Sequence, residues 1–164
     1  MNKDSLVHFT KYNFWANTKI TEFVLAAGET NANVELKSSF PTIRKTLLHI
    51  WDAETIWINR LQGKSLSDWP TKNFKGNMKE AFDGFLINSK SFIACAGEKT
   101  EQELSAPIIY KTLDGKEFSN TSSQIIMHCM NHSTFHRGQL ITMLRNVGLE
   151  KFSSTDYITF CRLK

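Results

Sequence analysis

Apolar residues recur every three or four positions along four long stretches of the chain, a spacing that places them on one face of a helix. Glycine or proline residues lie near several boundaries of these stretches. The pattern predicts four helices, over residues 5–27, 42–62, 78–96 and 122–147. Each helix would bury its apolar face against the others. The pattern is therefore typical of an all-α four-helix bundle.

The segment before the last predicted helix alternates apolar and polar residues instead. Ile108 and Tyr110 precede an Asp114-Gly115 pair, and Phe118 follows it. Asp-Gly favours a tight turn between two strands, so the sequence predicts a short β-hairpin here. The connection of residues 63–77 is long and contains Pro and Gly. A simple up-down-up-down order of the helices is therefore not established by the sequence.

Length and composition are those of a single globular domain, residues 1–164. The N-terminal residues are polar and mixed in charge, and no apolar run is long enough for a membrane span. The three cysteines show no paired spacing, which argues against a secreted disulfide scaffold. We therefore expect a cytoplasmic protein. The net charge of +4 comes from scattered lysines and arginines, so neither a nucleic acid nor a membrane is expected as partner.

Three of the five histidines fall within the stretch HCMNHSTFHRGQ, residues 128–139. His132 and His136 are four residues apart, so they lie on one face of the predicted helix and could hold one metal ion. No Glu follows His132, which excludes the HExxH zinc proteases. His128 is too distant to join both, because the helix rises about 12 Å from His128 to His136.

A third ligand is better supplied by a neighbouring helix. His49 lies among residues that should face the core, whereas His8 lies near the N-terminal end, so we select His49. Two alternatives stay open. Cys129 could complete a closed structural zinc site, or His132 and His136 could belong to a buried polar network without metal.

Two other features are assigned to packing. Gly138 lies inside a predicted helix, where glycine costs about 1 kcal/mol relative to alanine, and close approach of another helix would explain it. The four tryptophans are interpreted as packing in the core and at its rim. They are Trp15, Trp51, Trp57 and Trp69.

Several motifs together resemble the DinB family of small metal-binding bundles. They are NHSTFHRGQ followed by MLRNVG, YNFWAN near the start, TLLHIWDAETIWINRLQG in the second helix and STDYITF near the end. The resemblance spans nearly the whole chain. It implies a four-helix bundle with a long crossover, and one divalent ion per chain, zinc or nickel, on His49, His132 and His136. It also implies a homodimer.

The resemblance suggests a metal-dependent enzyme that activates a low-molecular-weight thiol or water for transfer or hydrolysis of a small molecule. His128 or Glu54 could assist proton transfer, and we expect His128, Cys129 and Gln139 around the metal or in its pocket. The alternative is a non-catalytic metal-binding or ligand-sensing dimeric bundle of the stress response. An open coordination position would distinguish the enzyme from the closed site of a structural protein.

Overall fold

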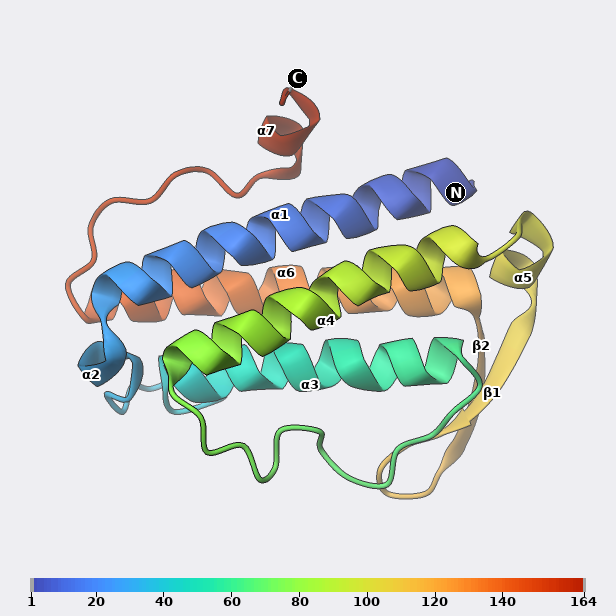
Figure 1. The fold of residues 1–164 in the computed structure, drawn as a ribbon, viewed down its shortest axis with the longest axis horizontal. Helices are drawn as coiled ribbons and strands as arrows, with labels where there is room; N and C mark the ends of the chain where they lie inside the picture. Colours follow the sequence, from blue (N-terminus) through green and yellow to red (C-terminus); the bar gives the residue numbers. More distant parts are fainter. Residues whose placement is uncertain (1, 164) are drawn as a thin grey trace.

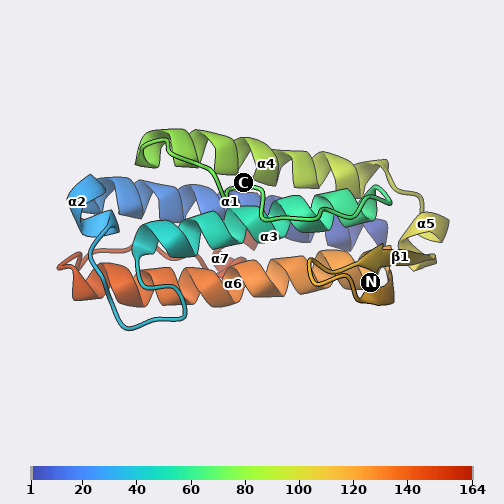
Figure 2. The same ribbon diagram turned by 90° about the horizontal axis from the view of Figure 1, so that it is seen from below.

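The computed structural model describes residues 2–163, and its four long helices lie side by side as a bundle (Figures 1 and 2). They are α1 (Lys3–Ala27), α3 (Ile43–Leu61), α4 (Met78–Glu98) and α6 (Ser122–Asn146). All four predicted helices are confirmed, and each end lies within two residues of its predicted position. In residues 2–163, no helix has the length and apolar content that crossing a bilayer requires.

The order of packing explains the long connection after α3. Helix α1 packs against α4 and α6, and α3 packs against the same two helices, so α1 and α3 lie diagonally across the bundle. Figure 1 shows α3 and α4 running in the same direction. The connection of residues 62–77 therefore has to return along the bundle. This connection is the long crossover that the family resemblance implies.

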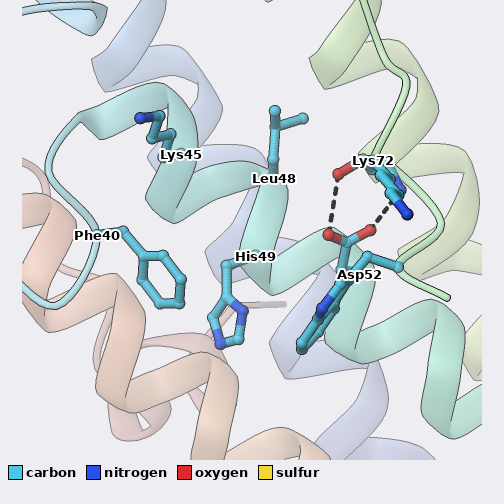
Figure 3. Close-up of a pocket in the computed structure, with 8 residues that line it drawn as sticks. Phe40, Lys45, Leu48, His49, Asp52 and Lys72 are labelled. Atoms are coloured by element: carbon cyan, nitrogen blue, oxygen red, sulfur yellow. Dashed lines mark hydrogen bonds between the residues drawn. The ribbon is translucent and has the colours of Figure 1, made fainter. Parts of the chain in front are cut away.

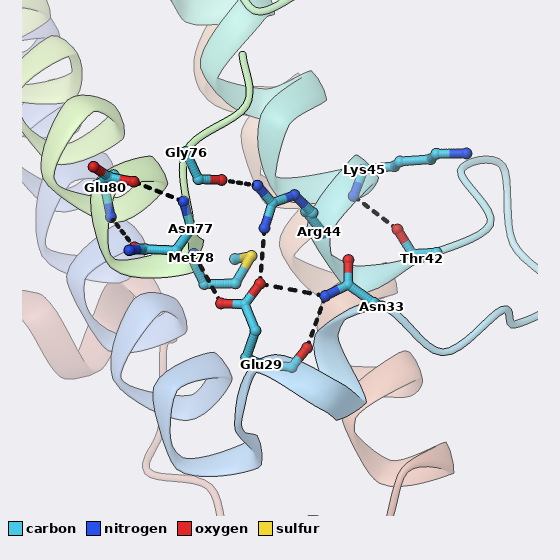
Figure 4. Close-up of polar contacts among 9 residues, drawn as sticks. All are labelled: Glu29, Asn33, Thr42, Arg44, Lys45, Gly76, Asn77, Met78 and Glu80. Atoms are coloured by element: carbon cyan, nitrogen blue, oxygen red, sulfur yellow. Dashed lines mark hydrogen bonds and ion pairs between the residues drawn. The ribbon is translucent and has the colours of Figure 1, made fainter.

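Side-chain caps fix where the long helices begin. The hydroxyl of Thr42 accepts a hydrogen bond of 3.0 Å from the backbone N–H of Lys45 (Figure 4). Asn77 and Glu80 form a reciprocal capping box at the start of α4, and Thr121 is the corresponding residue at the start of α6. Each cap satisfies backbone N–H groups that the first helical turn leaves unpaired.

Three short helices were not predicted from the sequence, because four or five residues are too few to show a helical period. They are α2 (Glu29–Ala32), α5 (Glu101–Ser105) and α7 (Tyr157–Cys161). The carboxylate of Glu29 accepts hydrogen bonds of 2.9 Å from both Arg44 and the backbone N–H of Met78 (Figure 4). Helix α2 therefore joins the starts of α3 and α4.

The predicted hairpin is present between α5 and α6. Strands β1 (Pro107–Lys111) and β2 (Glu117–Thr121) are antiparallel, and Tyr110 lies opposite Phe118. Gly115 in the turn has a φ of 82°, a left-handed conformation that favours glycine. Helix α6 begins directly after β2, so the hairpin leads into the helix that carries the histidines.

A layer of buried polar side chains divides the apolar core into two parts. Along every long helix, residues of one apolar cluster are followed by a polar position and then by residues of the other cluster. The polar layer consists of Asn13 and Asn17 on α1, Glu54 on α3, Ser89 on α4, and Ser133 and Arg137 on α6. Every long helix therefore contributes to the layer.

The explanation of Gly138 by close helix packing is wrong. A Cβ atom built on Gly138 would meet nothing within 4 Å, and the residue is exposed. The surface position leaves room for a side chain, and the packing of α6 does not require glycine there.

Candidate metal centre

Three histidines from two helices converge at the surface of the bundle. His132 and His136 lie one turn apart on α6, and His49 faces them from α3. The Nε2 atom of His132 lies 3.0 Å from Nε2 of His49 and 3.1 Å from Nε2 of His136. The three candidate ligand atoms lie within 4.8 Å of one another, which could hold a metal ion.

The spacing of the nitrogens suits a small divalent ion. Metal–nitrogen bonds of about 2.0–2.1 Å in a tetrahedral site place ligand nitrogens about 3.3 Å apart. The two observed Nε2 separations are close to this value. The Nδ1 atom of His132 is buried without a hydrogen-bond partner, so among its ring nitrogens only Nε2 has polar neighbours, namely the Nε2 atoms of His49 and His136. The three histidine Nε2 atoms are therefore suitably placed to bind a metal ion at the point where they meet.

Burial keeps the three rings in the neutral form that binds metals. It lowers the pKa of His49 to about 4, with a smaller contribution from the nearby His136. It lowers the pKa of His132 to about 3, helped by the charges of the neighbouring histidines. The pKa of His136 is lowered as well, again mainly by burial. At neutral pH each ring therefore has a lone pair to offer.

Neighbouring side chains set the orientation of two of the rings. The Nδ1–H of His136 donates a hydrogen bond of 2.7 Å to Oε1 of Gln139, whose amide nitrogen donates to Ser39 at 3.1 Å. This hydrogen bond leaves Nε2 of His136 as the free acceptor. The ring of Phe40 stacks on His49 with a centroid distance of 4.1 Å (Figure 3).

Two pockets meet at the triad. The first, of about 470 Å³, has Phe40 and Asp52 in its wall (Figure 3), and Trp69 lines it as well. The second, of about 390 Å³, includes His132 and His128. His49 and Trp69 line both pockets, so a small molecule in either one would be next to the triad.

Comparison with known proteins shows the family of the chain. The DinB family model matches residues 1–163. The chain belongs to the DinB family. Among the relatives with curated descriptions, Protein DinB of Bacillus subtilis strain 168 is 29% identical over 154 residues, which cover 90% of this chain and 88% of the relative.

Solved structures of DinB-like proteins have the same fold. One from Bacillus cereus ATCC 10987 gives a TM-score of 0.68 at 18% identity, over 89% of this chain and 95% of the other. Another from Bacillus subtilis gives a TM-score of 0.67 at 14% identity, over 90% and 96% of the two chains. These two similarities establish the bundle architecture of this DinB-family chain.

The other site candidates of this DinB-family chain lie in different surroundings. His128 is exposed, lines the second pocket, and packs against Trp57 with a ring-centroid distance of 4.8 Å. Glu54 is fully buried in the polar layer, where Asn13 donates to it at 2.6 Å. Cys129 is fully buried in an apolar cluster and does not belong to the group of three candidate ligands in residues 2–163. Burial raises the pKa of its thiol.

The walls of the site include residues that sequence reasoning did not assign to it. Ser39 and Phe40 come from the segment before α3, and Trp69 comes from the crossover. Trp57 and Trp69, interpreted as packing residues, line the second pocket. The available sequence signal was a tryptophan within the long connection of residues 63–77, and in the structure Trp69 is 45% exposed.

Proposed function

We propose that this protein is a divalent-metal enzyme that activates a low-molecular-weight thiol or water for transfer to, or hydrolysis of, a small molecule. The observation that carries this proposal is a group of three neutral histidines beside two pockets. Three protein ligands leave at least one position of a tetrahedral ion for an exogenous group, as in catalytic zinc sites. Imidazole donors suit zinc and nickel.

The residues around the triad have distinct roles in this proposal. A bound divalent ion would supply the positive charge that favours the deprotonated form of a thiol or water. Gln139 holds the ring of His136, and Phe40 holds the ring of His49. We assign proton transfer to His128, because its ring lines the second pocket, where partial desolvation and then the charge of Arg60 lower its pKa. Glu54 is enclosed in the polar layer, and we assign it a structural role.

Cobalt substitution tests the open position. We expect one cobalt ion per chain, and addition of 2-mercaptoethanol near neutral pH should produce a sulfur-to-metal charge-transfer band. His132→Ala should abolish metal binding and the band. His8→Ala is the matched control, because His8 packs against Tyr157 and Phe160, away from the triad, and it should keep both.

The outcome of the cobalt experiment distinguishes thiol activation, water activation and non-catalytic metal binding. A cobalt spectrum that responds to azide or to pH but to no thiol would overturn thiol activation and leave water activation. A spectrum that no small ligand changes would mean a closed site, and the enzyme proposal would fail in favour of non-catalytic metal binding. Full metal occupancy in His132→Ala would show that the triad is not the metal site.

A further inference from the structure

Arg60 is a buried arginine without an acidic partner. Its exposed fraction is 7%, and in residues 2–163 none of the ion pairs involves its guanidinium. Its Nη2 donates one long hydrogen bond of 3.4 Å to the carbonyl oxygen of Lys111. Its Nε is buried with no partner. Buried arginines are normally paired, so this guanidinium retains unused capacity for hydrogen bonds and for an anion.

Two aromatic rings hold the Arg60 guanidinium in place. Its central carbon lies 4.3 Å from the ring centroid of Trp57 and 4.6 Å from that of Tyr110. Cation–π contacts offset part of the cost of burying the charge. They do not supply a counter-ion, and burial lowers the pKa of Arg60. The cation is thus positioned in advance, while its charge remains uncompensated by the protein.

Arg60 shares the second pocket with two residues of the triad. His49 and His132 line this pocket, and Arg60 and the rings of Trp57 and Trp69 line it as well. At about 390 Å³ the pocket is of the size that takes a small molecule. One pocket therefore contains a cation, two aromatic faces and two of the three candidate metal ligands.

The other charged group in this wall is already paired. Asp114 also lines the pocket, but its carboxylate contacts Lys116 at 2.9 Å and accepts a hydrogen bond from the hydroxyl of Thr112. The Asp114–Lys116 pair contributes little net charge. The uncompensated charge of the pocket therefore comes from Arg60.

We propose that Arg60 binds the carboxylate of a small substrate whose aromatic or apolar body lies along Trp57 and Trp69. A planar carboxylate matches the planar fork of a guanidinium, and one arginine in an apolar wall suits a single negative charge better than a phosphate dianion. The placement of the substrate's reacting end at the triad rests on the proposed function. The carboxylate site itself does not require the metal.

Binding of benzoate to the metal-free full-length protein tests this site by isothermal titration calorimetry. Benzamide has nearly the same shape without the charge, and we expect it to bind at least about tenfold more weakly than benzoate. Arg60→Gln should weaken benzoate binding by a similar factor, and Arg60→Lys should weaken it less. Arg145→Gln is the matched control, because Arg145 also lies over an aromatic ring, that of Phe152, and does not line this pocket. It should bind benzoate as the wild type does.

The outcomes separate this inference from the proposed function. Arg60-dependent binding of benzoate in both the metal-free wild type and His132→Ala would support the site even if the cobalt protein exchanged no ligand. Binding only to metal-loaded protein, with equal affinity in Arg60→Gln, would make the metal the anion site and overturn the inference. Equal affinities for benzoate and benzamide would also overturn it. Inorganic phosphate binding as tightly as benzoate would overturn the assignment of a carboxylate with an apolar body.

Discussion

Glu54 and Arg137 are linked through two asparagines, and no salt bridge joins them directly. The amides of Asn13 and Asn17 donate to Glu54 Oε1 at 2.6 and 2.9 Å. The oxygens of the same amides accept hydrogen bonds from Nη1 of Arg137. Ser133 also donates to Glu54, at 3.4 Å. The buried charges of α3 and α6 are thus connected through α1.

Removal of either charge from this layer should destabilise the bundle strongly. Arg137→Met leaves the Glu54 carboxylate buried without its compensating cation. Loss of one partner of a directly paired buried charge typically costs about 3–5 kcal/mol in the free energy of unfolding, and we expect a cost of up to that size here because the contact runs through the asparagines. Urea unfolding followed by circular dichroism measures this cost. Glu54→Gln should be destabilising in the same way, because the Arg137 guanidinium would then be uncompensated.

The double variant provides the control for this prediction. If the two charges interact through the asparagines, Glu54→Gln combined with Arg137→Met should cost less than the sum of the single substitutions. Losses in the free energy of unfolding that simply add up in the double variant would contradict the linkage through the asparagines.

The stability of the metal-free protein should fall as the pH is lowered from 7 to 5. The pKa values of His49 and His132 are about 4 and about 3 in the folded state, below their ordinary value near 6.5. Below pH 6.5 the unfolded chain therefore takes up protons that the folded rings do not. This uptake favours unfolding progressively until the folded pKa values are reached. Urea titrations at a series of pH values measure the slope.

A variant without these two rings tests the origin of the slope. His49→Gln combined with His132→Gln should reduce the loss of stability between pH 7 and 5. Burial raises the pKa of Glu54, an effect of opposite sign that both proteins share. An unchanged slope in the double variant would assign the pH dependence to other groups.

Gln139→Ala should weaken metal binding without removing a ligand. The substitution deletes the acceptor of the His136 Nδ1–H, which orients the ring. Loss of such a partner typically lowers metal affinity by about 10- to 100-fold. Competition with a chromophoric chelator measures the affinity. Gln139→Glu retains a hydrogen-bond acceptor for His136 and should retain most of the metal affinity. Thr142→Ala, one turn further along α6, is the position control and should bind metal as the wild type does. Equal metal affinities in all variants would show that Gln139 does not support metal binding by orienting His136.

Gly138→Ala should stabilise the protein. Because a Cβ at Gly138 meets no other atom within 4 Å, the helical preference of alanine should be gained without a clash. The gain is about 0.5–1 kcal/mol. Thermal unfolding measures it. Gly84→Ala is the contrasting control, because its Cβ would overlap the ring of Trp51 and should lower stability. A destabilised Gly138→Ala would point to a covering partner on this face of α6.

The long helices were predictable because their signals are local. Apolar spacing marks each buried face, and caps such as Thr42 mark the ends. The pairing of His49 with α6 was also accessible, because a histidine within an apolar stripe requires a polar partner. The i, i+4 spacing of His132 and His136 then indicated where that partner would be.

The polar layer and the pocket were less accessible, because they depend on which helices become neighbours. Glu54 was considered for proton transfer, yet its partners include Asn13 and Asn17, about 40 residues earlier in the chain. Nothing local to Glu54 specifies those contacts. Arg60 lies three residues after Trp57 and four after Ile56, on the same face near the end of α3, which was a usable signal of burial. Its lack of an acidic partner is visible only in three dimensions.

The three candidate metal ligands all lie on helices, whereas much of the surrounding wall belongs to connections. Phe40, Trp69 and Thr112 lie in three separate connecting segments. Connections tolerate substitution, insertion and deletion far better than packed helices do. During evolution, the compounds that the pockets accept could therefore change while the histidines remain in register. Exchange of residues 62–77 between relatives should alter ligand preference and leave metal affinity nearly constant.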